Sequence, residues 1–317
     1  MIKNLLFFSI IFLNTLFYLF FQKIEIHDEV KIIIKPGNQL NQISDVLYEN
    51  GLIQDRFLFK LWVKINSSEK KLKFGEYLFE KKVSLNSILK KLKDGKSVNR
   101  KITIVEGSTK SDLLSILNNL NQDVTLKYEE IPNQIIANTY FYHVTDNPKQ
   151  ILKSIEAKSN YIASKIWDER DKTIPIKNIE ELFIISSIVE KETFLQEERS
   201  LISGVFYNRF SKNMKLQSDP TVVYALTLGK KKLGRKLLRK DLKFKSEYNT
   251  YVNKGLPPSP ICIPGVQSLI SASKPQHNPY LYFVSKNKKN EGHLFSVNYK
   301  DHLKKIKSIK EKKKEHE

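Results

Sequence analysis

The chain has 317 residues, 40% hydrophobic and 28% charged, which is enough to bury the cores of about two domains. Its formal charge of +20 favours an anionic partner such as nucleic acid, lipid head groups or an acidic polymer, unless it reflects only a Lys-rich composition. Cys262 is the only cysteine, which excludes an intrachain disulfide and a Cys-rich metal cluster. The histidines lack the close spacing of a zinc site. We therefore predict no metal and no cofactor.

The amino terminus carries an apolar run, LLFFSIIFLNTLFYLFF, at residues 5–21. Its length lies near the lower end of the ~17–25 residues that a transmembrane helix needs. No small-residue cleavage site follows it, which favours an uncleaved anchor over a cleaved signal peptide. Lys3 and Lys23 flank the run almost evenly, so charge orients it poorly. We predict a single transmembrane helix within an anchor at residues 1–26.

Residues 27–98 have the pattern of a small α+β module. A β-branched strand at 32–34 precedes a Pro-Gly turn and a helix that Gly51 closes. A second strand at 76–79 leads into a helix that Ser84 caps and that ends near Gly95. The strand-turn-helix pattern recurs in RKITIVEGSTKSDLLSILNNL, either as a repeat or by coincidence.

The rest of the chain, residues 99–317, mixes helices, strands and a long irregular part. Helical spacing covers 151–167 and 179–209, and residues 212–265 are rich in Gly, Pro, Asn and Tyr. Strands are predicted at 279–287 and 292–296, joined by a Lys-Asn turn, and a Lys-rich helix end follows from residue 300. We predict a mixed α/β domain here.

The stretch IISSIVEKETF at residues 184–194 places two acids after an apolar run. At about 100° per residue, Glu192 continues the helix face of Leu182, Ile185 and Ile188, whereas Glu190 lies about 200° away, where we expect water. Burial would raise the pKa of Glu192, as a general acid requires at neutral pH. The alternative is that Glu192 reaches solvent or pairs with Lys191 or Arg199.

Several long blocks then resemble one known family. IISSIVEKET, ERSLISGVFYNRF, MKLQSDPTVVYAL, YNTYVNKGLPPSPICIPG, NPYLYFVS and GHLFS, in this order, resemble the endolytic murein transglycosylase family called MltG or YceG-like. VKIIIKPG, FGEY and ITIVEG resemble its membrane-proximal part. Two positions depart from the family pattern: Asn138 replaces the acid of a Pro-Asp-Thr-Tyr block, and His302-Leu303 replaces a His-Asn pair.

The resemblance implies an α+β protein with a single N-terminal transmembrane helix, a LysM-like module at 27–98 and a YceG-like catalytic domain at 99–317 with a lysozyme-like catalytic helix. It implies a lytic transglycosylase, a lyase that cleaves the MurNAc–GlcNAc bond within peptidoglycan strands, leaves 1,6-anhydro-MurNAc ends and terminates strand elongation. The implied partners are glycan strands, the cytoplasmic membrane and peptidoglycan synthases (penicillin-binding proteins). The implied location is the cytoplasmic (inner) membrane, with the catalytic domain on its outer, periplasmic side. Nucleic acid is not expected, because no binding motif is present.

The resemblance assigns catalysis to the Glu-Lys-Glu-Thr block, where we choose Glu192 and keep Glu190 as the alternative. Sugar-binding candidates come from three segments, although each also has an ordinary structural explanation such as a helix cap, a packed turn or a strand end. They are Gln217, Ser218, Asp219 and Thr221, then Tyr248, Asn249 and Tyr251, then His293 and Ser296. The rival functions are a muramidase-type hydrolase and a non-catalytic peptidoglycan-binding or scaffold protein.

Overall fold

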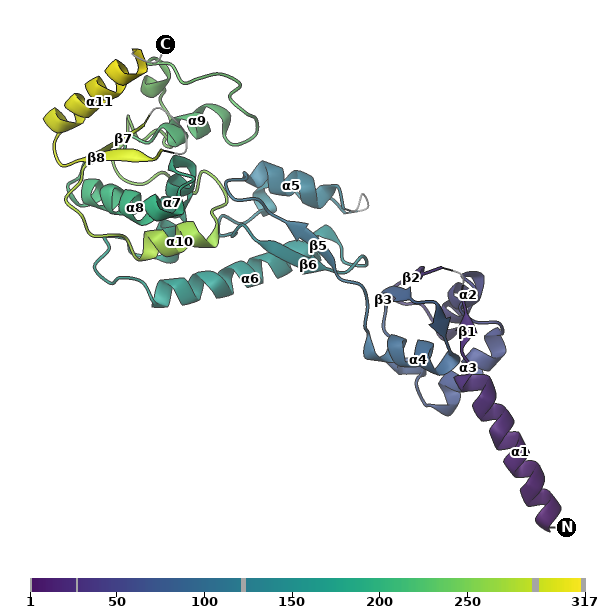
Figure 1. Cartoon of the computed structure of the whole chain (residues 1–317). Coiled ribbons are helices and arrows are strands. Elements are labelled where there is room, and N and C mark those ends of the chain that lie inside the picture. The colour runs from purple at the N-terminus through teal and green to yellow at the C-terminus, as the bar shows by residue number, and fades with distance from the viewer. Residues whose placement is uncertain (1, 27, 121–123, 287–290, 315–317) are drawn as a thin grey trace. The chain divides into compact units, whose positions relative to one another are not determined.

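The computed structural model describes residues 2–26, 28–120, 124–286 and 291–314, and the chain folds into two compact units (Figure 1). The first unit runs to residue 102 and includes 141–146, and the second contains 103–140 and the chain from 147 onward. The chain passes between the units in β5 (Arg100–Thr103) and β6 (Thr139–Tyr142), which pair with each other. The predicted domain limits at residues 26 and 98 remain predictions.

In its described residues, the first unit combines four helices with two small antiparallel sheets. β2 (Val30–Ile34) pairs with β3 (Gly75–Phe79), and β1 (Ile24–Glu25) pairs with β4 (Lys82–Val83). Its helices are α1 (Ile2–Phe21), α2 (Leu40–Glu49), α3 (Arg56–Ile65) and α4 (Leu85–Asp94), with a 3-10 turn at Glu69–Lys71. Alternate residues of β2, Ile32 and Ile34, point into the core with Leu47 and Phe59.

The ends of α4 are set by local chemistry that the sequence predicts. The Ser84 hydroxyl accepts a hydrogen bond from the Ser87 amide at 3.2 Å, which satisfies one free N–H of the first turn. Gly95 closes the helix with a φ of 69°, a left-handed conformation that favours glycine. The predicted cap and stop are both confirmed.

The predicted transmembrane helix is wrong. No helix among the described residues is long and apolar enough to cross a membrane. The apolar run does form α1, but Asn14 and Thr15 interrupt it, and its end packs against protein. Phe20 is 2% exposed and stacks on Trp62 of α3, with ring centroids 4.2 Å apart.

The second unit is mostly helical. Its described helices are α5 (Lys110–Asn118), α6 (Pro148–Asp168), α7 (Ile179–Glu192), α8 (Gln196–Ser211), α9 (Asp219–Thr227), α10 (Val266–Ser273) and α11 (Tyr299–Lys314), with 3-10 turns at Tyr128–Glu130 and Asp241–Lys243. β7 (Tyr282–Ser285) and β8 (His293–Ser296) form an antiparallel hairpin. Both strands were predicted, whereas the end of the first predicted strand and the Lys-Asn turn, at 287–290, fall outside the described residues. Both units mix helices with small sheets, so the α+β class is correct.

Helix α7 lies at the centre of this unit. It contacts α6, α8, α9 and α10 (Figure 1). Every side chain from Leu182 to Glu190 is buried. A helix covered on all sides has no water-facing stripe. The prediction that Glu190 faces water is therefore wrong, and Ser186 and Ser187 are buried with it.

Candidate active site

Glu192 is the last residue of α7, at a break between two helices. The sequence predicts continuous helical spacing over 179–209, but the structure interrupts it at residues 193–195. The hydroxyl of buried Thr193 accepts a hydrogen bond from the Leu195 amide at 3.1 Å, which stabilises the turn into α8. The carboxyl group of Glu192 therefore sits at the edge of a buried helix rather than within a continuous one.

The Glu192 side chain is partly buried and has one hydroxyl donor. Ser218 Oγ donates to Glu192 Oε1 at 2.5 Å. Burial raises the pKa of Glu192 to about 7, the nearby charge of Asp219 also raises it, and the Ser218 hydrogen bond and the charge of Arg209 hold it lower than burial alone would. A carboxyl group with such a pKa exchanges its proton near neutral pH, as general acid–base catalysis requires.

Ser218 is held in place by the start of α9. Its backbone N–H donates to Thr250 Oγ1 at 3.0 Å, and its carbonyl accepts from Thr221 Oγ1 at 2.6 Å. Pro220 lies in the first turn of this helix, as the sequence predicts. The contacts fix the hydroxyl that faces Glu192.

Arg209 supplies a buried positive charge near Glu192. Its guanidinium donates to the carbonyls of Leu281 at 2.6 Å and Leu216 at 2.8 Å, and to Gln217 Oε1 at 3.3 Å. Burial lowers the pKa of Arg209, although arginine stays charged at neutral pH. Its charge favours the ionised form of Glu192, because opposite charges attract more strongly where water is excluded.

Asp219 is the second acid close to Glu192. It is exposed and accepts a hydrogen bond from the Tyr251 hydroxyl at 2.6 Å. Burial and the neighbouring Asp219 carboxylate raise the pKa of Tyr251, so the phenol keeps its proton and remains a donor. Among the predicted sugar-binding residues, Ser218, Asp219 and Tyr251 are thus brought together with Glu192, with exposed Gln217 beside them.

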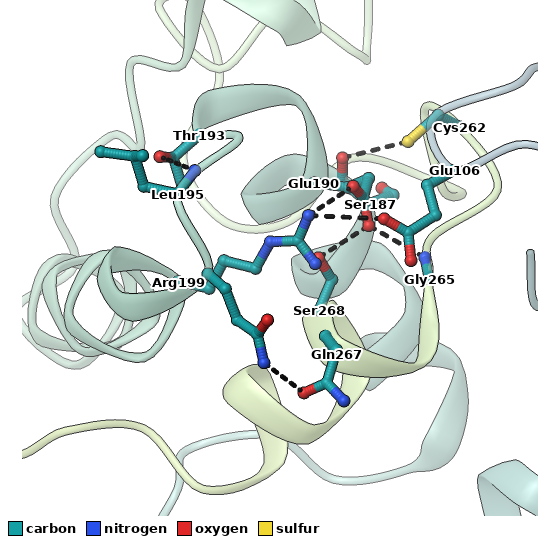
Figure 2. Close-up of polar contacts among 11 residues, drawn as sticks. Glu106, Ser187, Glu190, Thr193, Leu195, Arg199, Cys262, Gly265, Gln267 and Ser268 are labelled. Atoms are coloured by element: carbon teal, nitrogen blue, oxygen red, sulfur yellow. Dashed lines mark hydrogen bonds and ion pairs between the residues drawn. The ribbon is translucent and has the colours of Figure 1, made fainter. Parts of the chain in front are cut away.

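The alternative acid, Glu190, is part of a buried network (Figure 2). It is 6% exposed and forms an ion pair with Arg199 at 3.1 Å. Its other oxygen accepts hydrogen bonds from the Gly265 amide at 2.9 Å and from Ser268 Oγ at 2.7 Å. A carboxylate whose oxygens are all engaged joins α7, α8 and α10 and is poorly placed to meet a substrate.

Thr221, Tyr248 and Asn249 direct their polar atoms into the fold. Asn249 is fully buried and donates to the carbonyls of Leu242 and Phe244 at 3.1 and 2.7 Å. Thr221 is also fully buried, and the Tyr248 hydroxyl pairs with Ser259 Oγ at 2.8 Å. These residues shape the loops around Ser218, and their predicted contact with sugars remains a prediction.

His293 and Ser296 lie on β8. His293 Nδ1 lies 2.7 Å from Glu198 Oε2, and Glu198 in turn accepts a hydrogen bond from Thr193 Oγ1 at 3.3 Å. His293 is thereby linked to the break after α7, whereas Ser296 is 1% exposed within the hairpin. Their role at a cleft edge remains a prediction.

Arg209 and Arg199 were not among the predicted catalytic or binding residues. Each is buried in α8, and Arg199 was considered only as a partner of Glu192. The sequence offers little to reveal them, because α8 also carries polar residues such as Glu197 and Asn208, and the acceptors that a buried arginine requires come from other parts of the fold. Cys262 is buried, its thiol contacts the Ser187 carbonyl, and burial raises its pKa. In the described part of the chain, no group of three acidic, His or Cys side chains is arranged to hold a metal.

Comparison with known proteins places the chain in a family. The sequence model of the YceG-like family matches residues 32–308, so the chain belongs to that family. It is 29% identical over 307 residues to the endolytic murein transglycosylase of Bacillus subtilis (strain 168), covering 87% of this chain and 83% of the relative. It is 26% identical over 302 residues to the protein of that name from Streptococcus pneumoniae serotype 2 (strain D39 / NCTC 7466), covering 81% of this chain and 54% of the relative.

A crystal structure of a yceG-like protein from Listeria monocytogenes has a similar fold. It matches with a TM-score of 0.53 and 29% identity, over 87% of this chain and 99% of the other. The resemblance stated from the sequence blocks is confirmed.

Proposed function

We propose that the chain is an endolytic murein transglycosylase, a lyase that cuts within peptidoglycan glycan strands, with Glu192 as the acid and then the base. The names of its relatives support the activity. The observation that carries the role of Glu192 is its environment: a partly buried carboxyl with a pKa of about 7, next to a hydroxyl donor and a buried arginine. Glu190 has no comparable freedom, since Arg199, Gly265 and Ser268 occupy its oxygens.

The proposed reaction needs one carboxyl group. The protonated Glu192 gives its proton to the glycosidic oxygen between MurNAc and GlcNAc, and the bond from that oxygen to the anomeric carbon of MurNAc breaks. Positive charge develops on the sugar, and the 6-hydroxyl of the same MurNAc attacks the anomeric carbon. Glu192, now ionised, accepts the hydroxyl proton, and the products are a 1,6-anhydro end and a free GlcNAc hydroxyl. The attack is intramolecular, so no water has to be positioned.

The surroundings of Glu192, including Arg209 and Ser218, suit both of its roles, as proton donor and then as proton acceptor. Burial keeps the proton on Glu192 before cleavage, while the Ser218 hydrogen bond and the Arg209 charge stabilise the carboxylate that remains afterwards. A pKa near the working pH lets one group serve as both donor and acceptor.

A hydrolase remains the second candidate because of Asp219. Hydrolytic glycosidases use two carboxylates, and the charge of Asp219 acts on Glu192. Its exposure and its bond to Tyr251 favour a binding role instead.

The test is a digest of isolated sacculi with wild type and Glu192→Gln, followed by mass spectrometry. We expect 1,6-anhydro ends from the wild type and no fragments from the variant. Reducing-end sugars would indicate the hydrolase, and binding without any release would indicate a scaffold protein. Internal cleavage is recognised by products several disaccharides long.

We also propose where the protein acts and which partners it has. Peptidoglycan lies outside the cytoplasmic membrane, so the catalytic unit would work on the outer side of that membrane. Exposed apolar side chains on α1, among them Ile10, Ile11 and Phe17, support contact with the membrane surface. Cell fractionation with and without residues 2–21 tests this, and an unchanged distribution would contradict it.

The first unit is proposed to be the LysM-like glycan-binding module. Its order of β2, α2, α3 and β3, with an antiparallel β2–β3 pair, supports that proposal. Association with peptidoglycan synthases and termination of nascent strands rest on the family resemblance, and co-purification with a penicillin-binding protein would test the association.

A further inference from the structure

A basic cavity lies beside Glu192 in the second unit. It has a volume of about 800 Å³, within the usual range of ligand pockets. The loop at residues 105–109, helix α9 and the loop at residues 229–233 line it, together with Lys191. Lys191 directly precedes Glu192, and Asp219 also lines the cavity. Asp219 links the two places, because it lines the cavity and its charge also acts on Glu192.

The cations of the cavity are available to a ligand. Lys191, Lys230, Lys231 and Lys232 line it, and all four are exposed. Within the described part of the chain none of them forms an ion pair. Lys230 has a weaker contact, with its ammonium 5.6 Å from the centre of the Tyr128 ring.

The acids of the cavity are already engaged. Glu106 lies 3.5 Å from Arg199, and Asp112 accepts hydrogen bonds from the backbone and hydroxyl of Thr109 at 2.8 and 2.9 Å. Asp219 accepts from Tyr251. The lysines thus face the cavity as unneutralised positive charge, which favours an anionic ligand.

We propose that this cavity binds the carboxylate groups of the peptide stems carried by the glycan strand. The proposal rests on the proposed function, because a stem is attached to the MurNAc ring whose bond is cut beside Lys191. Stems are the anionic substituents of such a strand, and lysine ammonium groups at an open cavity bind carboxylates without fixing one geometry. The cavity would then select strands that still carry their peptides.

The test measures binding of one disaccharide with its peptide stem, in two forms: carboxyl groups free and carboxyl groups amidated. A GlcNAc–MurNAc disaccharide lacks the MurNAc–GlcNAc bond that the proposed reaction cuts, so the result does not depend on the role of Glu192. We expect the wild type to bind the free form more tightly. The triple variant Lys230→Gln, Lys231→Gln and Lys232→Gln should bind it about tenfold more weakly, since each exposed ion pair contributes a few tenths of a kcal/mol or more.

The matched control removes the same charge from the same loop outside the cavity. Lys236→Gln, Arg239→Gln and Lys240→Gln alter exposed residues that do not line it, and their affinity should stay within about twofold of the wild type. The proposal is overturned if the wild type does not bind the free form, if amidation leaves its affinity unchanged, or if both triple variants weaken binding equally. Failure of Glu192→Gln to stop strand cleavage would instead contradict the proposed function and leave this binding result intact.

Discussion

Replacing Glu192 with glutamine should stabilise the folded protein at alkaline pH while it removes activity. Glutamine has the same shape, cannot ionise, and keeps an oxygen that can accept the Ser218 hydrogen bond. The wild-type carboxyl, by contrast, must lose its proton in a partly buried site. An enzyme that holds such a group trades stability for function.

The magnitude follows from the two pKa values of Glu192. The value is about 7 in the folded chain and 4.5 in an ordinary setting. Below the lower value both states hold the proton, so the variant gains nothing. Between the two values the unfolded chain releases its proton first, and wild-type stability falls as pH rises. Above the higher value the penalty is complete, at about 3 kcal/mol as an upper limit.

The assay is urea unfolding of wild type and Glu192→Gln at about pH 4 and about pH 8.5, where linkage predicts the extremes. The variant should be about 1 to 3 kcal/mol more stable at the higher pH and nearly equal at the lower one. Glu247→Gln, at an exposed residue, is the control and should show no such difference. A variant that is equally or less stable at the higher pH would contradict a raised pKa of Glu192 in the folded chain.

Three further substitutions separate chemistry from scaffold. Ser218→Ala removes a hydrogen bond to the Glu192 carboxylate, so the alkaline limit of kcat/KM should move up by about one pH unit; an unmoved limit contradicts this. Glu190→Gln removes the buried ion-pair partner of Arg199 and leaves it only the half-exposed Glu106, so the free energy of unfolding in urea should fall by about 3 kcal/mol while folded molecules stay active; full stability with lost activity would instead assign catalysis to Glu190. Arg209→Lys keeps the charge but loses carbonyl contacts, so stability should fall by about 2 kcal/mol with little change in the pH limit; a shifted limit with unchanged stability would contradict that.

The sequence predicts helix ends correctly where a short motif sets the local backbone conformation. Ser84 and Gly95 bound α4, and the Ser-Asp-Pro of residues 218–220 begins α9. Each depends on a cap or a restricted backbone angle within a few residues. The sequence blocks that resemble the family also located the catalytic unit within the chain.

The burial of Glu190 and Glu192 could not be predicted from the helical spacing of apolar residues. Periodicity assumes that a helix has one wet face, but α7 is covered by four helices, which bury Glu190 and leave Glu192 only partly buried. No Gly or Pro marks the helix break after Glu192 in the sequence. The break is stabilised instead by a hydrogen bond from the Leu195 amide to the Thr193 hydroxyl. Arg209 depends on carbonyls up to 72 positions away in the sequence, which no local pattern encodes.

The most direct measurement is the titration of Glu192 itself. Infrared difference spectra of wild type minus Glu192→Gln, recorded across pH, isolate the carbonyl band of the protonated carboxyl. This band should disappear with a midpoint near pH 7, matching the raised pKa of Glu192. A midpoint near the ordinary value of 4.5 would mean that Glu192 is ionised at neutral pH and cannot act as the proton donor.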